Sequence, residues 1–171
     1  MLEKVAYSSK CIRRAVTRKY VLDAPVFIYG AHLIGVTYTV PEVTRELKSS
    51  RAEIVLQEFL REGLKIEEPS KKAVRLVTEK AKSTGEHLRL SQADIDVLAK
   101  ALEVNGTVVT DDYSVQNVAA QLGVETQQIL QPPIKQVIKW GRRCVGCGRV
   151  YKTAEVCPVC GSEVRLKPMK K

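Results

Sequence analysis

The sequence lacks the segments that mark secreted, membrane-spanning or repetitive proteins. Its first twenty residues contain no apolar core of the kind that a secretory signal peptide requires. The most apolar stretch is 21–40, but Asp23, Pro25, His32 and two glycines interrupt it. A buried strand, a helix and a second short strand explain this stretch better than a membrane helix, which needs about 20 consecutive apolar residues. Apart from two similar cysteine pairs there is no internal repeat. We therefore expect a globular cytoplasmic protein with no membrane partner.

Cysteine is scarce outside one short segment. Four of the five cysteines form two Cys-x-x-Cys-Gly pairs separated by nine residues, and Cys11 lies apart as an expected free thiol. In a reducing compartment this spacing indicates metal ligands, with paired disulfides or a redox dithiol as the alternatives. Zn²⁺ favours four thiolates, which leave no open position for a substrate. We therefore predict one structural zinc ion, without which so small a module could hardly fold. Its ligands would be Cys144, Cys147, Cys157 and Cys160.

Basic residues are concentrated at the two ends of the sequence. The net charge is +9, of which residues 1–20 contribute +5 and residues 134–171 contribute +8, leaving −4 between them. Basic ends fit a polyanionic partner that the ends bind, whereas the alternative is that they only raise solubility. The charge pattern favours the first interpretation.

Hydrophobic periodicity predicts strands that alternate with helices. Besides the strands in the apolar stretch, we expect strands over 64–67, 107–110 and 124–127. The expected helices cover 25–33, 41–48, 51–61, 71–84, 92–105 and 114–122. This order predicts an α/β fold with a mainly parallel sheet flanked by helices. Ligands of such sheets bind at the carboxyl ends of the strands.

The same features divide the chain into four parts. Residues 1–18 form a basic N-terminal tail, and residues 19–128 form the α/β domain. Residues 129–136, with Pro132-Pro133, form a linker, and residues 137–168 form a four-cysteine zinc ribbon.

Acidic residues follow two of the expected strands. Asp23 ends the strand at 20–22, and Asp111 and Asp112 follow the strand at 107–110. If these strands are neighbours, their carboxylates meet at one sheet edge, where repulsion would cost roughly 4 kcal/mol per pair at about 4 Å without a cation. Mg²⁺ and Mn²⁺ prefer oxygen ligands, activate water and stabilise a phosphodiester transition state. The pattern therefore suits metal-dependent phosphodiester hydrolysis.

Several of these acids also have a structural interpretation. Asp94 and Glu42 stand three residues after Ser91 and Thr39, where a capping box explains them without any chemistry. Glu46 lies one turn after Glu42 and has no capping role, so we prefer Glu46 as the ligand.

The two adjacent aspartates raise the same question. One of Asp111 and Asp112 can cap the helix that follows, which leaves the other for a metal ion. We prefer Asp112 for the metal.

Four segments together resemble the motifs of PIN-domain nucleases. They are Asp23 after an apolar strand, Val40-Pro41-Glu42-Val43-Thr44-Arg45-Glu46-Leu47, Leu90-Ser91-Gln92-Ala93-Asp94 and Val109-Thr110-Asp111-Asp112. The resemblance implies a Rossmann-like fold, one or two Mn²⁺ or Mg²⁺ ions, and RNA cleavage that leaves a 3′-hydroxyl. By position it implies Asp23, Glu46, Asp94 and Asp112 as ligands, Asp111 as an assistant or replacement for Asp112, and Thr110 as an orienting group.

A PIN-like domain followed by a four-cysteine ribbon is a narrower match. It resembles the short archaeal form of the Nin-one-binding family of ribosome-biogenesis endonucleases over nearly everything after residue 18. The resemblance implies cleavage of precursor small-subunit rRNA near its 3′ end, with the small ribosomal subunit and assembly-factor proteins as partners. The alternatives are a non-catalytic RNA-binding assembly factor and a toxin-type ribonuclease. The full acid set argues against the former, and the ribbon against the latter.

Basic and aromatic residues surround the cysteine pairs. Such cations neutralise phosphates and such rings stack on bases. The candidates for RNA contact are Arg142, Arg143, Arg149, Tyr151 and Lys152, with Arg165 and Lys167 nearby. Trp140 and Tyr151 could instead form the small core of the ribbon.

Overall fold

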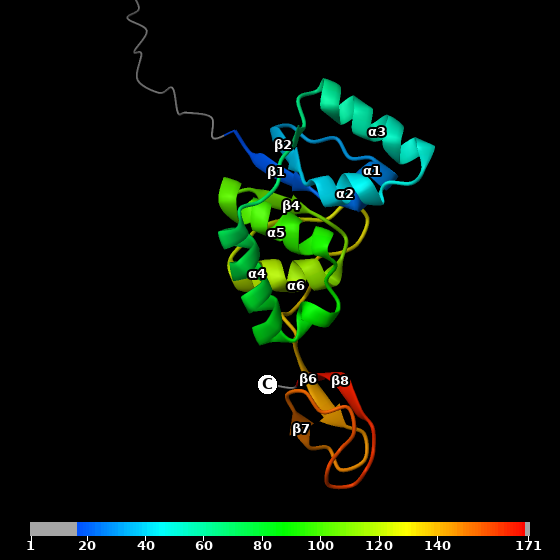
Figure 1. Ribbon diagram of the computed structural model, residues 1–171. Coiled ribbons are helices and arrows are strands. Elements are labelled where there is room, and N and C mark those ends of the chain that lie inside the picture. Colours follow the sequence, from blue (N-terminus) through cyan, green and yellow to red (C-terminus); the bar gives the residue numbers. More distant parts are fainter. Residues whose placement is uncertain (1–16, 170–171) are drawn as a thin grey trace, which may run out of the picture.

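The computed structural model describes residues 17–169. The basic tail expected over residues 1–18, including Cys11, therefore lies almost entirely outside the described residues. Figure 1 shows a larger body of helices around a sheet and a smaller body of strands, joined by a narrow neck.

The sheet of the larger body has five strands, and every neighbouring pair is parallel. The strand order is β3-β2-β1-β4-β5, so β1 is central. The strands are β1 (Lys19–Leu22), β2 (Val36–Thr39), β3 (Lys65–Ile66), β4 (Thr107–Val109) and β5 (Thr126–Gln127). The predicted parallel α/β sheet is thus confirmed, and β1 and β4 are neighbours, as the acidic pattern required.

Helices cover both faces of this sheet. Figure 1 shows α3 on one side and α4, α5 and α6 on the other. The helices are α1 (Ala24–Tyr29), α2 (Pro41–Glu46), α3 (Ser50–Arg61), α4 (Lys71–Thr84), the 3-10 turn η1 (Glu86–Leu88), α5 (Gln92–Val104) and α6 (Tyr113–Leu122). Within the described residues, none of the helices is long and apolar enough to cross a membrane.

Local sequence explains most helix ends. The capping box predicted at Ser91 is present, because Ser91 and Asp94 exchange side-chain and backbone hydrogen bonds. Ser70 caps α4 by accepting from the amide of Ala73. Two expected ends were wrong: α1 stops at Tyr29 because Gly30 follows with φ of 79°, and α2 stops at Glu46, before Lys48.

The capping box predicted at Thr39 was also wrong. Thr39 is the last residue of β2, and its hydroxyl donates to the carbonyl of Leu22 at 2.9 Å. Val40 occupies the N-cap position of α2 without a side-chain hydrogen bond. The Thr39 hydroxyl is therefore bonded to the neighbouring strand β1 and does not cap α2. Glu42 consequently has no capping-box partner.

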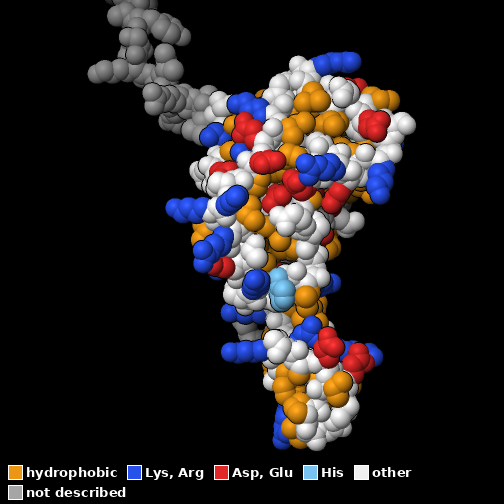
Figure 2. All heavy atoms as spheres, viewed as in Figure 1, with side chains coloured by type: hydrophobic (Ala, Val, Ile, Leu, Met, Phe, Trp, Pro, Cys, Tyr) orange, Lys and Arg blue, Asp and Glu red, His pale blue; other side chains and the backbone are white. Residues whose placement is uncertain are grey.

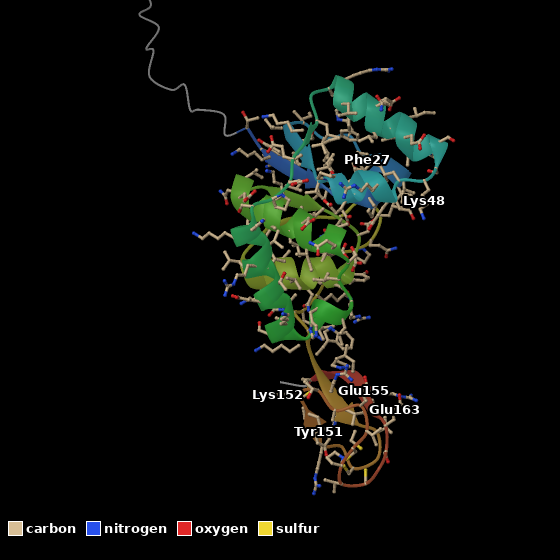
Figure 3. The ribbon with its side chains drawn as sticks, in the orientation of Figure 1. Phe27, Lys48, Tyr151, Lys152, Glu155 and Glu163 are labelled. Carbon is tan, nitrogen blue, oxygen red and sulfur yellow. The ribbon has the colours of Figure 1, made fainter. Side chains whose placement is uncertain are left out.

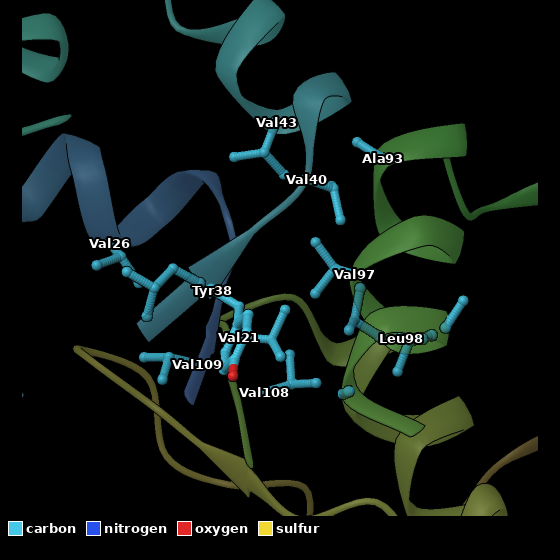
Figure 4. Packing of buried hydrophobic residues seen from close by; sticks show 14 of the residues in the cluster. Val21, Val26, Tyr38, Val40, Val43, Ala93, Val97, Leu98, Val108 and Val109 are labelled. Atoms are coloured by element: carbon cyan, nitrogen blue, oxygen red, sulfur yellow. The ribbon is translucent and has the colours of Figure 1, made fainter. Parts of the chain in front are cut away.

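The core lies between the sheet and both helix layers. Figure 4 shows Val21 and Val108 from the central strands on the side of Val97 and Leu98 of α5, with Val109 on the other side of the strands. All five are fully buried, and burying each aliphatic side chain stabilises the fold by about 1.5–3 kcal/mol. This packing holds the carboxyl ends of β1 and β4 in fixed positions.

The smaller body is a three-stranded antiparallel sheet with the order β7-β6-β8. Its strands are β6 (Lys139–Cys144), β7 (Val150–Tyr151) and β8 (Val164–Met169). Its buried core contains only Cys144, Cys157 and Val164.

Candidate functional site

Asp23 lies at the carboxyl end of the central strand and is only 5% exposed. One carboxylate oxygen accepts from the amide of Ala24 at 2.7 Å, which caps α1. The other accepts from the hydroxyl of Thr110 at 2.6 Å. That hydroxyl in turn accepts from the amide of Asp112 at 3.0 Å. The Thr110 hydroxyl therefore connects the ends of β1 and β4. It orients the carboxylate of Asp23 by donating to it and the backbone of Asp112 by accepting from its amide.

The protein holds Asp23 in surroundings that oppose its negative charge. Burial raises its pKa from the ordinary 3.8 to about 6, although the hydrogen bonds from Thr110 and Ala24 favour the charged form. The carboxylates of Asp94 and Asp112 raise the pKa further.

Two helices bring further carboxylates to this place. Asp94 stands in the first turn of α5, where one of its oxygens accepts from the amide of Ser91 at 2.7 Å. Burial raises the pKa of Asp94, and the charges of Asp112 and of Glu46, the last residue of α2, raise it as well. The structure therefore brings Asp23, Glu46, Asp94 and Asp112 into one electrostatic cluster, called here the acid cluster.

The two adjacent aspartates point to different places. Asp112 is the N-cap of α6, with its carboxylate accepting from the amide of Ser114 at 2.6 Å, and it also acts on Asp23 and Asp94. Asp111 accepts backbone hydrogen bonds from residues 129–131 at 2.8–3.3 Å. The expectation that the residue left for capping would differ from the metal candidate is wrong as regards the cap, since Asp112, the residue preferred for the metal, is itself the N-cap of α6.

A second acidic pair lies beside the acid cluster. Glu42, one turn before Glu46 on α2, forms an ion pair with Arg45 at 2.6 Å. Burial raises the pKa of Asp96, which accepts from Gln92 at 2.7 Å, and the charge of Glu42 adds to this rise. Asp96 is 7% exposed and was missed by sequence reasoning, because its spacing from Asp94 places it on a different face of α5.

The acid cluster has no internal counter-charge. Within residues 17–169, no Lys, Arg or His forms an ion pair with any of its four members. Figure 2 shows acidic side chains gathered on the larger body. Their oxygens are the hard ligands that Mg²⁺ and Mn²⁺ prefer, and a bound cation would favour the charged form of Asp23 against the burial, and the weaker repulsion from Asp94 and Asp112, that raise its pKa. No three of these carboxylates bring ligand oxygens within 4.8 Å of one another in the described chain, so the side chains as placed do not form a closed metal site and an ion there would need other ligands, such as water.

The four ribbon cysteines form a tighter group. Their sulfur atoms all lie within 4.8 Å of one another, with Cys144 and Cys160 at 3.4 Å and Cys147 and Cys157 at 3.6 Å. A tetrahedral zinc site with Zn–S bonds of about 2.3 Å has sulfur–sulfur edges of roughly 3.8 Å. The group can therefore hold a metal ion with four thiolates and no remaining position.

Neighbouring groups favour the thiolate at two of the four cysteines, Cys157 and Cys160. At Cys147 the backbone hydrogen bond from Arg149 lowers the pKa, but burial and hydrogen bonds with the other cysteines outweigh it and raise the pKa to about 11. The Tyr151 hydroxyl lies 3.0 Å from the Cys157 sulfur, and its hydrogen bond lowers the pKa of Cys157 to about 6. Ser162 lowers the pKa of Cys160 in the same way. Tyr151 also packs on the ribbon core, so its ring is a core element, as the alternative interpretation proposed.

The basic candidates of the ribbon lie largely on its surface. Arg143, Arg149 and Lys152 are exposed, and Arg142 is half-buried. Arg143 donates to the carbonyl of Gly148 at 2.9 Å, which fixes it against the first cysteine pair. In Figure 3, Lys152 lies on the opposite side of the ribbon from Glu155 and Glu163.

Trp140 has a position that neither sequence interpretation foresaw. It lies outside the ribbon core, and its indole N–H donates to Glu86 of the larger body at 2.7 Å. The Arg89 guanidinium lies over the indole ring, 4.3 Å from its centre. The side-chain amide of Asn117 on α6 donates to Glu86 at 2.6 Å, donates to the carbonyl of Ile138 at 2.7 Å and accepts from the Ile138 amide at 2.7 Å. Glu86 and Asn117 were missed because their roles depend on contacts between distant segments.

The chain is similar to proteins of known class along nearly all of its length. The family model for the PIN domain of ribonuclease matches residues 20–104. An "Endoribonuclease Nob1" of Pyrococcus abyssi is 46% identical over 154 residues, which cover 88% of this chain and 94% of the relative. An "Endoribonuclease Nob1" of Methanothermobacter thermautotrophicus is 38% identical over 91% of this chain and 96% of the relative. A "Ribonuclease VapC1" of Thermoplasma acidophilum is 37% identical over 72% of this chain and 63% of the relative.

Proposed function

The chain belongs to the Nob1 endoribonuclease family, and on this basis we propose that it is a metal-dependent endoribonuclease that cleaves precursor small-subunit rRNA near its 3′ end. The observation that carries the proposal is the position of Asp23: a carboxylate buried at the end of the central strand, near the carboxylates of Asp94 and Asp112 and without a basic ion-pair partner within residues 17–169. Such an arrangement costs stability unless a cation binds there.

The acid cluster would hold one or two Mn²⁺ or Mg²⁺ ions, with Asp23, Glu46, Asp94 and Asp112 as ligands. A bound divalent ion would supply Lewis-acid stabilisation of the phosphodiester and an activated water. The hydroxyl of Thr110 fixes one oxygen of Asp23, and the amide of Ser91 fixes one oxygen of Asp94. These bonds leave the remaining lone pairs of both carboxylates in a defined direction, which is the positioning that such chemistry requires.

The ribbon would bind zinc through its four cysteines and supply much of the affinity for RNA. The acid cluster repels phosphates, whereas residues 134–171 carry a charge of +8. The partners would be the precursor rRNA, the small ribosomal subunit and assembly-factor proteins, in the cytoplasm, where thiols stay reduced.

A cleavage assay tests this proposal. The full chain is incubated with an RNA that spans the 3′ end of small-subunit rRNA, with Mn²⁺ or with EDTA. We expect one metal-dependent cut that Asp23→Asn reduces at least about 100-fold while RNA binding persists. Glu79→Gln, an exposed acid on α4 paired with Arg75, is the matched control and should cut normally. Binding without any cut, on naked RNA and on immature small subunits alike, would overturn the nuclease and favour a non-catalytic assembly factor.

A further inference from the structure

A cavity of about 340 Å³ lies where the larger body meets the ribbon. One wall is Glu86 with Arg89, a second is the start of α6, and the third is the linker with Trp140. Its volume lies in the range of sites that bind small organic groups. The acid cluster uses none of the residues that line it.

Two of these walls lead directly to the acid cluster. Tyr113, which lines the cavity, follows Asp112 in the chain, and the amide of the next lining residue, Ser114, donates to the carboxylate of Asp112 at 2.6 Å. Arg89 stands two residues before Ser91, which caps α5 together with Asp94. Two walls of the cavity are therefore separated from the acid cluster by only a few residues of the chain.

The cavity offers flat surfaces of the kind that bind nucleobases. The Tyr113 ring is 48% exposed, and no hydrogen bond of its hydroxyl is present among residues 17–169. The Arg89 guanidinium is stacked on Trp140 at 4.3 Å. Unpaired RNA bases stack on aromatic rings and on guanidinium planes.

Glu86 provides an unused hydrogen-bond acceptor in the same wall. It is 1% exposed, and its Oε1 accepts from Trp140 and Asn117. Its Oε2 is the one buried side-chain oxygen or nitrogen without a partner in the described chain. Buried polar atoms are almost always paired, and nucleobases carry the amino and imino N–H groups that would complete this one.

We propose that this cavity binds one unpaired nucleobase of the RNA substrate, next to the phosphate that is cut. The base stacks on Tyr113 or on the Arg89–Trp140 pair and donates to Glu86. The identity of the substrate as RNA rests on the proposed function, whereas the recognition of a base rests on the cavity. Because the linker and Trp140 form one wall, the ribbon completes a site that the larger body alone lacks.

The single tryptophan of the chain makes the test direct. The full-length protein with zinc bound is titrated, without added Mg²⁺ or Mn²⁺ and without a chelator, with nucleoside 5′-monophosphates, ribose 5-phosphate and inorganic phosphate, and Trp140 fluorescence is recorded. We expect saturable quenching by the nucleotides and none by the two base-free anions. Tyr113→Ala should weaken nucleotide binding about 5- to 100-fold. Tyr29→Ala, a comparably exposed tyrosine at the end of α1, is the control and should bind as the unmodified chain does.

The outcomes separate this proposal from the nuclease itself. Equal quenching by ribose 5-phosphate, or unchanged affinity in Tyr113→Ala, would overturn base recognition even if RNA is cut. Quenching that depends on the base and on Tyr113 supports the cavity even if no RNA is cut. Asp23→Asn should keep the nucleotide quenching and lose cleavage, which places the two functions on different residues.

Discussion

The two parts of this protein place their candidate metal ligands, carboxylates in one and thiols in the other, in different surroundings. The larger body has a broad apolar core, and the carboxylates of its acid cluster lie outside this core, beside the carboxyl ends of the central strands. Among the described residues, the ribbon buries only Cys144, Cys157 and Val164, so two of its four candidate ligands make up most of its core. The comparison teaches that a metal would serve chemistry in the first part and folding in the second. Each prediction below tests that difference, beginning with the largest effect.

Loss of one ribbon thiol should unfold the ribbon alone. Cys157→Ser removes a buried ligand, and zinc binding by such modules contributes about 10–16 kcal/mol at neutral pH. We expect loss of bound zinc and proteolysis after residue 137, with residues 19–128 still protected. Zinc content and limited proteolysis measure this, and Cys11→Ser, outside the two pairs, should retain zinc. Unfolding of both parts together would contradict the division.

Substitution of the buried Asp23 should stabilise the larger body, whereas loss of a ribbon thiol unfolds the ribbon. The raised pKa of Asp23 means that the folded protein favours the protonated form, so above pH 6 its charge destabilises the metal-free fold. A shift from 3.8 to about 6 corresponds to about 3 kcal/mol. Asp23→Asn should therefore raise the thermal midpoint of the zinc-bound protein at pH 7.5 without added Mn²⁺ or Mg²⁺, and it should abolish the further rise that Mn²⁺ produces. A lower midpoint without added Mn²⁺ or Mg²⁺ would show that Asp23 is structural.

The same titration predicts the pH dependence of metal binding. Mn²⁺ requires the ionised carboxylate, so its affinity should rise with pH up to about 6 and then level off. The stability of the metal-free chain should fall over that range, because deprotonation of a group with a raised pKa disfavours the folded state. Calorimetric titration and thermal unfolding between pH 4.5 and pH 8 record both trends. A profile without a break near pH 6 would contradict the assignment to Asp23.

The junction between the parts can be weakened by one methyl group. Gly85 ends α4 with φ of 78°, and a Cβ there would lie 2.5 Å from the carbonyl oxygen of Trp140. Gly123 ends α6 with φ of 72° and has nothing within 4 Å of that position. Both alanine variants lose about 1 kcal/mol through backbone strain, but Gly85→Ala should lose about 1–2 kcal/mol more and should change Trp140 fluorescence. Equal losses would mean that the ribbon does not pack there.

The sequence anticipated what depends on local chemistry. The parallel sheet, the Ser91 capping box and the tetrad of cysteines follow from periodicity and spacing, and all are present. The errors arose where a side chain had two local roles and a distant segment decided between them. Thr39 bonds to β1, and Asp111 bonds to the linker. Glu86 lies after an ordinary helix end, so no local pattern marks it as the partner of Trp140.

The edges of the five-stranded sheet affect the tendency of the protein to aggregate at high concentration. The outermost strands, β3 and β5, are each two residues long. An incoming extended chain would gain only one or two backbone hydrogen bonds at either side, too few to offset the loss of its conformational freedom. Short edge strands thus disfavour the addition of further strands to this parallel sheet.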